Sequence, residues 1–566
     1  MWPLFPSSTV SPVRYGASTR FVSLGRITTL VAMRRRRFWG WGYEDEHPDP
    51  MQLEAIAGVL GPLLGVERVA RVAPPALEEL ELRASRVRPP ESLAPIVTID
   101  RFERALHSYG RSYRDIVRAL RRDFKNPPDL VGVPENETDV VRILDFCESE
   151  RIAVIPYGGG SSVCGGVEPV VSDRFSGTLS LDLRRLDRVV EVDRVSRAAR
   201  IQAGVLGPSL EAQLRPLGLT LRHYPQSFEF SSLGGWIATR SGGHFATLYT
   251  HIDELVESLR VVTPTGVIAT RRLPGSGAGP APERLFIGSE GILGVIVEAW
   301  MRLFERPRFR ASASARFPDF LAGARAVRAL VQSGLNPQNC RLLDPLEALL
   351  NGVGPGDCAV LLVGFESADH PLDAWLARAS ELCRAAGGEV SMSRAKDAGS
   401  EQRTDESSAW RLAFLRAPYL RDELIALGVL VETCETAVTW DRFEALHEAV
   451  MSAAREAAGR GGKALVTCRI THAYPDGAAP YFTVLAAARR GGELEQWDEI
   501  KAAVTEAVLR EGGTTTHHHA VGRDFRPFYE RERAEGFALA LAAAKRALDP
   551  AGMLNPGVLL EPEPRS

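Results

Sequence analysis

Hydrophobic and polar positions along residues 136–270 alternate in a way that predicts a continuous α/β region. The stretch 136–151 begins with Asn-Glu-Thr, a start typical of helix capping, and then places apolar side chains at helical spacing. These apolar positions are Val140, Val141, Leu144 and Cys147. The apolar run 152–156 follows directly and predicts a short buried strand.

The remaining segments of this region predict further strands and one helix. Residues 177–193 and 198–205 alternate as paired strands do, and 207–218 predicts a helix that ends at Gly218. Two more strands are predicted within 255–270, joined by a Pro-Thr-Gly turn.

Helical periods become longer after Pro307, which predicts a second α+β region. Residues 314–334 begin this region, and 476–490 predicts a strand. The segment 496–513 predicts a helix that ends at a glycine pair. A last helix is predicted within 534–556, where Asp-Pro and Ala-Gly stop it.

Composition narrows the class of protein. The 566 residues exceed what one core accommodates, so two or three domains are expected. They are 45% hydrophobic and 25% charged with a net charge of -3, which argues against nucleic acid as a partner. No apolar run is long enough for a membrane span. The seven cysteines include no Cys-x-x-Cys pair, which is typical of free thiols in a reducing compartment, so we predict a cytoplasmic protein.

The first 36 residues differ in composition from the rest. They are rich in Ser, Thr and Arg, and the chain has no acidic residue before Glu44. This resembles a transit peptide, whereas Met33, directly before RRRRFWGWGY, is also consistent with a mis-assigned start or a disordered leader. The final Pro-Arg-Ser is not a peroxisomal address.

A glycine-rich loop, PYGGGSSVCGG at 156–166, follows the predicted buried strand. Successive glycines let backbone N–H groups point inward and enclose an anion, and the hydroxyls of Ser161 and Ser162 add donors. The loop lacks the G-x-G-x-x-G spacing of a Rossmann unit. Alone, it is as consistent with a flexible turn as with a phosphate site.

Three further stretches change this interpretation: PQSFEFSSLGGWIATRSGG at 225–243, GSEGILGVIVEA at 288–299 and DPAGMLNPG at 549–557. In this order and spacing, the four stretches resemble the FAD-binding oxidoreductases of the vanillyl-alcohol oxidase type. The resemblance implies an α+β fold with a two-part FAD-binding domain, an α/β cap domain and a helical carboxyl-terminal segment. It implies FAD bound non-covalently, because His244, the nearest candidate for a tether, lacks a tether spacing.

The same resemblance divides the chain and assigns the cofactor contacts. The expected divisions are a leader (1–36), a helical region (37–123), the FAD-binding domain (124–306), the cap or substrate domain (307–510) and a segment that returns to the flavin (511–566). The first contact segment would hold the pyrophosphate, and the others would surround the adenosine and isoalloxazine. The predicted contacts are Pro156, Tyr157, Gly158, Gly159, Gly160, Ser161, Ser162, Gln226, Ser227, Phe228, Glu229, Phe230, Ser231, Ser232, Ala238, Thr239, Arg240, Ser241, Glu290, Gly291, Ile292, Leu293, Gly294, Val295 and Ile296.

Rarer stretches resemble the alkyldihydroxyacetonephosphate synthase family more narrowly, from about residue 37 to 560. They include RFWGWGYEDE at 37–46, APYLRDE at 417–423 and THHHAVG at 516–522. In that family, a flavoenzyme of ether-lipid synthesis exchanges the acyl group of acyl-dihydroxyacetone phosphate for a fatty alcohol, without net oxidation. Such an exchange needs a base for the C1 proton, stabilisation of an enolate-like carbon and a cationic phosphate site.

The resemblance gives Tyr481, in GAAPYF, the role of the family's catalytic tyrosine. A phenol with a pKa near 10 acts as a base only beside positive charge or hydrogen-bond donors. We expect His517, His518 and His519 to supply these as an acid/base and anion-binding cluster. Adjacent side chains diverge, so at least one of the three would have a supporting role. A core tyrosine is the plain alternative for Tyr481.

Two arginines complete the expected site by resemblance. Arg421 would bind the phosphate through paired hydrogen bonds, and Arg341 aligns with another functionally sensitive arginine. An ordinary surface pair with Asp422 is the alternative for Arg421. We predict no metal, because the histidines would need ligands from elsewhere, such as Asp524 or His472, and no metal-ligand spacing appears.

Three functions remain in competition. The first is the ether-forming exchange, with small lipid substrates and no nucleic acid. Here RRRRFWGW would place cations and tryptophans on an anionic membrane surface, or would be a basic, partly disordered strand. A homodimer is left open. The second is an FAD-dependent dehydrogenase of a 2-hydroxy acid such as D-lactate or glycolate. The third is a flavin-binding protein with a decayed site.

Overall fold

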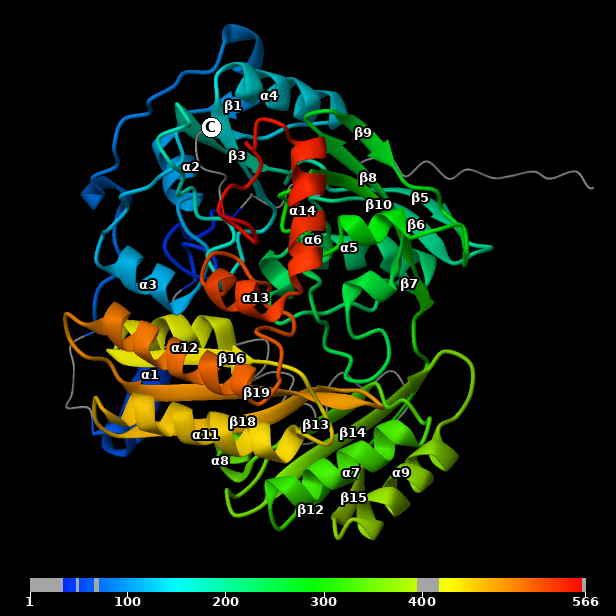
Figure 1. The fold of residues 1–566 in the computed structure, drawn as a ribbon. Coiled ribbons are helices and arrows are strands. Elements are labelled where there is room, and N and C mark those ends of the chain that lie inside the picture. Colours follow the sequence, from blue (N-terminus) through cyan, green and yellow to red (C-terminus); the bar gives the residue numbers. More distant parts are fainter. Residues whose placement is uncertain (1–33, 47–49, 66–70, 394–416, 562–566) are drawn as a thin grey trace, which may run out of the picture.

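The computed structural model describes residues 34–46, 50–65, 71–393 and 417–561 (Figure 1). Most of the predicted leader lies outside these ranges. Figure 1 shows one large sheet in the lower part of the molecule and two smaller sheets above it, with α13 (Arg526–Glu532) and α14 (Glu535–Leu548) on the side of the smaller sheets. The described part thus mixes helices and sheets, as the sequence predicts, with one hydrophobic core around the large sheet and a second around the two smaller ones.

The first small sheet carries the glycine loop at the end of its strand β3. Its strands, in sheet order, are β1 (Val97–Thr98), β2 (Leu130–Gly132), β4 (Gly177–Asp182) and β3 (Ile152–Tyr157). Strands β2, β4 and β3 are parallel, and α4 (Glu137–Ser149) connects β2 to β3. The side chain of Asn136 caps α4 by accepting a hydrogen bond from the Asp139 backbone N–H, which confirms the predicted helix start. Ligands of α/β sheets bind at the carboxyl ends of parallel strands, where this loop lies.

The second small sheet is antiparallel. Its strands, in sheet order, are β5 (Val189–Asp193), β6 (Ala198–Gln202), β10 (Val295–Arg302), β8 (Val256–Thr263) and β9 (Gly266–Ala269). The predicted strand pair within 255–270 is confirmed as β8 and β9. The pairing predicted for 177–193 is only partly right, because β5 pairs with β6 whereas β4 belongs to the first sheet. Every residue of β4 is buried, as is typical of a strand inside a parallel sheet.

Short elements complete the part around the small sheets. Helix α5 (Gly207–Leu214) ends before the predicted Gly218, because Pro216 has no N–H to continue the helical hydrogen bonds and the chain tightens into a 3-10 turn. The remaining elements are α1 (Pro50–Leu64), α2 (Arg101–Leu106), α3 (Tyr113–Leu120), α5 (Gly207–Leu214), β7 (Leu219–Thr220), α6 (Leu233–Thr239) and β11 (Phe304–Glu305).

The large sheet is antiparallel and carries the side chains of the candidate site. Its strands, in sheet order, are β15 (Glu389–Ser393), β12 (Phe309–Phe317), β14 (Ala359–Ser367), β13 (Asn339–Leu343), β18 (Ala464–Ala473), β19 (Gly477–Ala487) and β16 (Val429–Glu435), with β17 (Val438–Thr439) beside β19. Its helices are α7 (Phe320–Gln332), α8 (Pro345–Leu350), α9 (Asp373–Ala385), α11 (Phe443–Gly459) and α12 (Glu493–Arg510). The strand predicted at 476–490 is confirmed as β19, the longest strand of the sheet.

The carboxyl-terminal segment returns to the first small sheet. Helices α13 (Arg526–Glu532) and α14 (Glu535–Leu548) follow the histidines, and the second confirms the predicted last helix. Beyond α14, Leu554 forms a parallel bridge with Val154 of β3. The side chain of Asn555 donates to the backbone oxygens of Glu290 and Gly166, at 2.7 and 3.1 Å. The end of the chain therefore fastens two glycine-containing segments to each other.

The amino-terminal basic segment packs inside the molecule. Phe38, Trp39 and Trp41 are each less than 10% exposed, and Arg36 lies against the ring of Phe230. The expectation that these tryptophans lie at a membrane surface is therefore wrong, because their apolar area is buried in the protein core. No helix within the described ranges is both long and apolar enough to cross a bilayer.

Candidate functional site

Two of the predicted cofactor segments meet at the glycine loop. A Cβ atom on Gly159 would lie 1.6 Å from the Phe230 carbonyl oxygen, and one on Gly158 would lie 2.1 Å from Oγ of Ser232. The loop thus approaches the segment 226–232 backbone to backbone, which only glycine permits. Arg36 donates to the carbonyl oxygen of Gly159 at 2.7 Å, so a cation lies beside the predicted pyrophosphate loop.

Gly159→Ala tests this close approach. The new Cβ has to displace either the loop or the backbone at Phe230, and we expect at least about tenfold weaker FAD binding, a loss of about 1.4 kcal/mol or more. The flavin-to-protein absorbance ratio after gel filtration measures the effect. Gly275→Ala is the matched control, because its Cβ would meet nothing within 4 Å. An unchanged ratio in Gly159→Ala would show that the loop does not hold the cofactor.

The third predicted segment joins the same place through Glu290. This buried carboxylate accepts backbone hydrogen bonds from Val521 and Gly522, both at 2.9 Å, just after the histidines. A Cβ on Gly291 would lie 2.8 Å from Cγ of Pro156, at the start of the loop. Residues from β3, from the segment before β10 and from the carboxyl-terminal segment are therefore held together.

The pKa of Glu290 gives a testable pH dependence. Burial raises it from 4.5 to about 7, against the two backbone donors. Between these values the unfolded chain has released a proton that the folded protein keeps, so stability falls as pH rises from about 4.5 to 7. The variant Glu290→Gln loses one hydrogen bond at every pH. It also has no titrating carboxyl group at this position, so the decline in stability, which amounts to about 3 kcal/mol at most, disappears. We expect the melting temperature of the variant, relative to the unaltered protein, to rise between pH 4.5 and pH 8, and a constant difference would contradict the shifted pKa.

The other predicted cofactor residues differ in what their side chains contact: some are buried among apolar groups, and others form hydrogen bonds or ion pairs within the protein. The side chains of Phe230, Ile292, Leu293, Val295 and Ile296 are buried in apolar surroundings, so contacts from these positions would have to come from the backbone. Oγ of Ser162 accepts a hydrogen bond from the Gly166 N–H inside its own loop, and Ser232 caps α6. At the end of α6, Arg240 adopts a left-handed conformation and pairs with Asp253. Whether the predicted positions contact FAD stays a prediction.

The chain's residues fit the implied FAD. The glycine loop lies at the carboxyl end of β3 with Arg36 beside it, an arrangement suited to a pyrophosphate. His223 is buried, and its Nδ1 atom has no hydrogen-bond partner among the described residues. It lies next to Gly243, whose added Cβ would be 3.0 Å away, so it offers a polar contact to a bound ring system.

The three consecutive histidines are held by one buried carboxylate. Glu435, at the end of β16, accepts hydrogen bonds from the backbone N–H groups of His517, His518 and His519, and from Oγ1 of Thr516. Three successive backbone donors that converge on one anion form a nest. The nest fixes the backbone of the histidine segment, so the three side chains diverge from a rigid base.

Tyr481 lies in the middle of this arrangement. On β19 it is paired in register with Glu435 of β16 and with Arg469 of β18. The Arg469 guanidinium is 3.9 Å from the centre of the Tyr481 ring. The rings of His518 and His519 are centred 6.1 and 5.8 Å from it. The structure therefore brings the predicted catalytic tyrosine and two of the predicted histidines together.

Burial shifts the pKa values of these side chains. Burial lowers the pKa of His517 and His518 well below the ordinary value, so both are neutral imidazoles. Burial raises the pKa of Tyr481, and Arg469 and Arg421 oppose this shift. The positive charge beside the phenol therefore comes from the two arginines, and the expectation that the histidines assist the phenol, here as hydrogen-bond donors, stays a prediction.

Arg421 approaches the same site from the helix 417–426. It donates to the Arg111 carbonyl oxygen at 2.6 Å and to Asp422 at 3.2 Å. Its Nε atom is buried and has no hydrogen-bond partner among the described residues. Asp422 is 1% exposed and accepts from the Trp41 backbone N–H at 2.6 Å, so the alternative of a surface pair is excluded.

Arg341 is completely buried on β13. Its Nη2 donates to the His244 carbonyl oxygen at 2.8 Å. Burial, and then the neighbouring Arg469, lower its pKa from 12.5 to about 9. Arg341 also lowers the pKa of His472 and His518, which places it within electrostatic reach of the histidine cluster. Its predicted role at the substrate stays a prediction.

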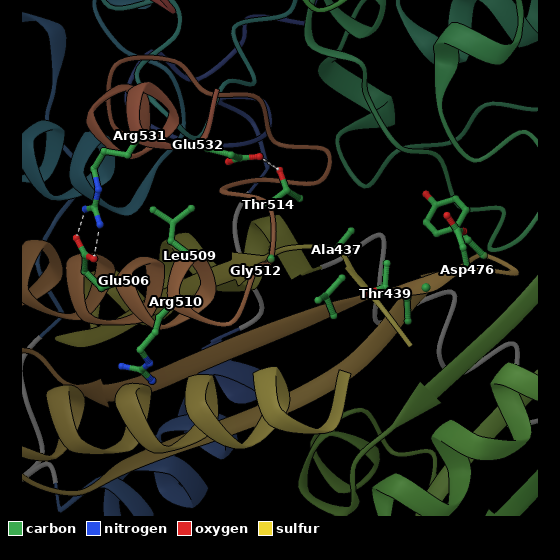
Figure 2. Close-up of a pocket in the computed structure, with 15 residues that line it drawn as sticks. Ala437, Thr439, Asp476, Glu506, Leu509, Arg510, Gly512, Thr514, Arg531 and Glu532 are labelled. Carbon is green, nitrogen blue, oxygen red and sulfur yellow. Dashed lines mark hydrogen bonds and ion pairs between the residues drawn. The ribbon is translucent and has the colours of Figure 1, made fainter. Parts of the chain in front are cut away.

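An open groove lies beside the segment that leads into the histidines. It has a volume of about 950 Å³, and Figure 2 shows the Glu506–Arg531 ion pair on one side and Asp476 on the other. Thr514 and Tyr474 also line this groove. Solvent in the groove thus comes close to the polypeptide that carries the predicted catalytic histidines.

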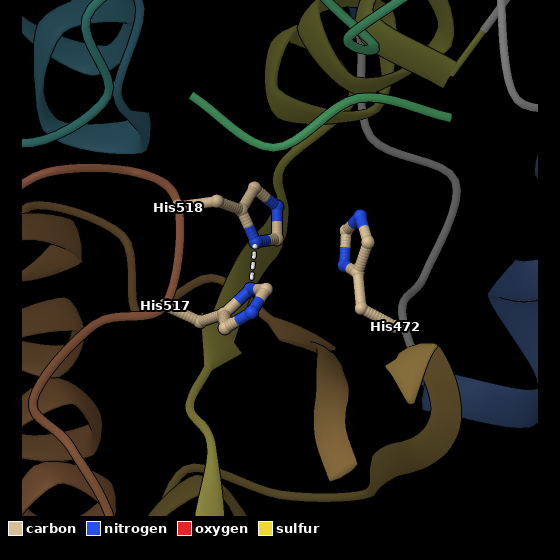
Figure 3. Close-up of side chains that lie close together, drawn as sticks. All are labelled: His472, His517 and His518. Carbon is tan, nitrogen blue, oxygen red and sulfur yellow. Dashed lines mark hydrogen bonds between the residues drawn. The ribbon is translucent and has the colours of Figure 1, made fainter. Parts of the chain in front are cut away.

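The histidine cluster extends beyond the consecutive three. Nδ1 of His517 is 3.0 Å from Nδ1 of His518, and His472 faces this pair (Figure 3). His472 Nε2 donates to the Gly243 carbonyl oxygen at 2.8 Å. His472, His517 and His518 offer ring nitrogens within 4.8 Å of one another, a spacing that a metal could use. The prediction of no metal stays a prediction.

Sequence reasoning missed several residues of this site. They are Arg36, Glu435 and Arg469. For Glu435 and Arg469, the available signal was a charged residue in a segment that otherwise predicts a buried strand, since such charges are retained where they have partners.

Two stretches of the chain match known protein families. The FAD binding domain family matches residues 128–271, and the family of FAD linked oxidases, C-terminal domain, matches residues 306–559. The fold and site thus define a flavoprotein of the FAD-linked oxidase class, with FAD as its cofactor.

Individual relatives narrow the class. The alkyldihydroxyacetonephosphate synthase of Dictyostelium discoideum is 31% identical over 488 residues, covering 81% of this chain and 78% of the relative. That of Trypanosoma brucei brucei is also 31% identical and covers 83% and 79%. A solved alkyldihydroxyacetonephosphate synthase superposes with a TM-score of 0.76 at 25% identity, over 92% of this chain and 98% of that one. The chain belongs to the alkyldihydroxyacetonephosphate synthase family.

Proposed function

We propose that this protein forms alkyl-dihydroxyacetone phosphate from acyl-dihydroxyacetone phosphate and a fatty alcohol, with no net oxidation. One observation carries the proposal beyond family membership. Tyr481 is buried between the Arg469 guanidinium and the His518 and His519 rings. This is a proton-transfer group among fixed cations and neutral imidazoles, which suits a reaction that moves protons at carbon.

The chain's own residues have separable roles in this reaction. Tyr481 exchanges a proton with C1 of the substrate, and Arg469 stabilises its phenolate form through the ring contact. Arg421, with a buried Nε that has no partner among the described residues, binds the phosphate. Neutral His518 and His519 accept or donate protons as the acyl group leaves. Bound FAD supplies the nucleophile that C1 requires.

An anaerobic assay tests the proposal. The purified flavoprotein is incubated with palmitoyl-dihydroxyacetone phosphate and hexadecanol, without an electron acceptor. We expect palmitate release and an alkyl ether product, with the flavin spectrum oxidised at the end. If no ether forms and D-lactate or glycolate bleaches the flavin, the protein is a 2-hydroxy acid dehydrogenase and the proposal fails.

The proposal includes a cytoplasmic location. It is compatible with a homodimer and with a peripheral contact to a membrane. Such a contact does not involve the amino-terminal tryptophans, which are buried. Light scattering during gel filtration and sedimentation with lipid vesicles test the two associations separately.

A further inference from the structure

A chain of hydrogen bonds connects the buried histidines to the open groove. His517 contacts His518 through Nδ1 at 3.0 Å, and its Nε2 lies 2.7 Å from the Tyr474 hydroxyl and 3.1 Å from Nε2 of His251. Tyr474 also contacts His251 and Oγ1 of Thr250, at 3.2 and 3.1 Å. Because Tyr474 lines the groove, the chain runs from the catalytic cluster to solvent.

The outer end of this chain is held in place by the backbone. His251 Nδ1 lies 2.9 Å from the carbonyl oxygen of Arg240, which can only accept, so Nδ1 carries the proton. In the neutral ring, Nε2 is then an acceptor that faces Tyr474 and His517. Tyr474 lies in the tight turn between β18 and β19, and its carbonyl oxygen accepts a hydrogen bond from Trp440. Neither side chain has a role in the reaction proposed above.

The proposed reaction must export a proton. The C1–O bond to the acyl group breaks, the C1–O bond to the alkyl group forms, and the alcohol loses its hydroxyl proton. At neutral pH the fatty acid leaves as a carboxylate, so one proton is released per turnover. His517 and His518 cannot keep it, because burial lowers the pKa of both.

We propose that His251 and Tyr474 are the outward half of a proton relay that carries this proton from the His518–His517 pair to solvent in the groove. The relay needs two arrangements of the same hydrogen bonds. In the first, a His518 that has gained the reaction's proton donates from Nδ1 to Nδ1 of His517, and His517 Nε2–H donates to the Tyr474 oxygen. In the second, His517 Nδ1–H donates to His518, which is neutral again, and Tyr474 donates to His517 Nε2 the proton that it took from that atom. Tyr474 passes its original hydroxyl proton to Nε2 of His251 or to solvent in the groove, so one proton leaves the cluster and both histidines end neutral. This proposal rests on the proposed function.

Tyr474→Phe tests the relay, because it removes one hydroxyl and keeps the ring. We expect kcat for ether formation to fall at least about tenfold, with KM changed less than about threefold, because only the proton route is broken. The solvent isotope effect on kcat in D2O should increase. His251→Asn, whose amide can still donate to the Arg240 carbonyl, should show a smaller effect in the same direction.

Controls separate the relay from a structural role. Tyr529→Phe removes a phenol outside the relay and should leave kcat, KM and the isotope effect unchanged. If Tyr474→Phe keeps the kcat and isotope effect of the unaltered enzyme, the relay is overturned. It is equally overturned if kcat falls together with FAD content while the isotope effect stays constant, because that pattern indicates a structural role alone.

A spectroscopic readout does not depend on activity. Long-range proton–nitrogen NMR spectra of protein with ¹⁵N-labelled histidine should show His251 protonated at Nδ1 and a His517 signal that changes in Tyr474→Phe. A His517 signal unaffected by Tyr474→Phe would show that the hydrogen-bond chain does not exist. If the unaltered enzyme formed no ether, the proposed function would fall, and this spectrum would still decide whether the chain is present.

Discussion

Replacing Tyr481 with Phe should reduce ether formation by about three orders of magnitude, through kcat and not through KM. General acid–base groups typically contribute factors of about 10² to 10⁴. The phenyl ring preserves the packing against Arg469 and against the rings of His518 and His519, so FAD and substrate should still bind. Product formation and flavin content, measured on the same preparation, separate the lost proton transfer from a lost cofactor.

The matched control is Tyr113→Phe. Tyr113 is also almost completely buried, and its hydroxyl has no hydrogen-bond partner among the described residues. Removing that hydroxyl should leave activity and melting temperature close to those of the unaltered protein. A Tyr481→Phe variant with more than about a tenth of normal kcat would show that the phenol is not the proton-transfer group.

Glu435→Ala should lower both stability and activity, because one carboxylate holds the whole histidine segment. The change leaves the backbone N–H groups of His517, His518 and His519 and the Thr516 hydroxyl without their acceptor. Each unsatisfied buried donor costs about 1–3 kcal/mol, so we expect a loss of at least about 3 kcal/mol. Misplaced histidines should reduce kcat by about 100-fold. Thermal unfolding and the ether assay measure the two effects.

Two further variants test whether the effect comes from the carboxylate of Glu435 itself. Glu435→Gln keeps one acceptor oxygen and should lie between Ala and the unaltered protein in both measurements. Glu444→Gln, at an exposed position in the first turn of α11, should change neither. An Ala variant of normal stability and activity would contradict the role assigned to the Glu435 carboxylate.

Local patterns predicted the elements of the fold well. Helix α4 was predictable because its cap and its apolar spacing are both encoded within 136–151. The assignment of β4 to the first sheet was not, because pairing depends on residues far apart in the chain. The burial of Trp39 and Trp41 also depends on residues far apart in the chain. Tryptophans beside arginines have the same local sequence pattern in a membrane anchor and in a segment that packs inside the protein.

From the sequence, only those residues of the candidate site could be predicted that belong to a recognisable stretch of their own. Tyr481 and the histidines were recognisable in their own stretches, whereas Glu435 and Arg469 join the candidate site only through their register with Tyr481 on β19. His472 faces the cluster after a register shift between Ile470 and His472 of β18. Simple strand alternation cannot foresee such a bulge. The sequence also left open whether the histidines would be charged or neutral, because their pKa values depend on burial and not on residue type alone.

The most direct test of the account follows the oxygen of the fatty alcohol. The enzyme is incubated anaerobically with palmitoyl-dihydroxyacetone phosphate and hexadecanol labelled with ¹⁸O, and the product is analysed by mass spectrometry. If the alcohol replaces the acyl group at C1, the ether carries the label, palmitate carries none, and no electron acceptor is consumed. Unlabelled ether would contradict replacement of the acyl group at C1 by the alcohol, and turnover only with an electron acceptor would contradict an exchange without net oxidation.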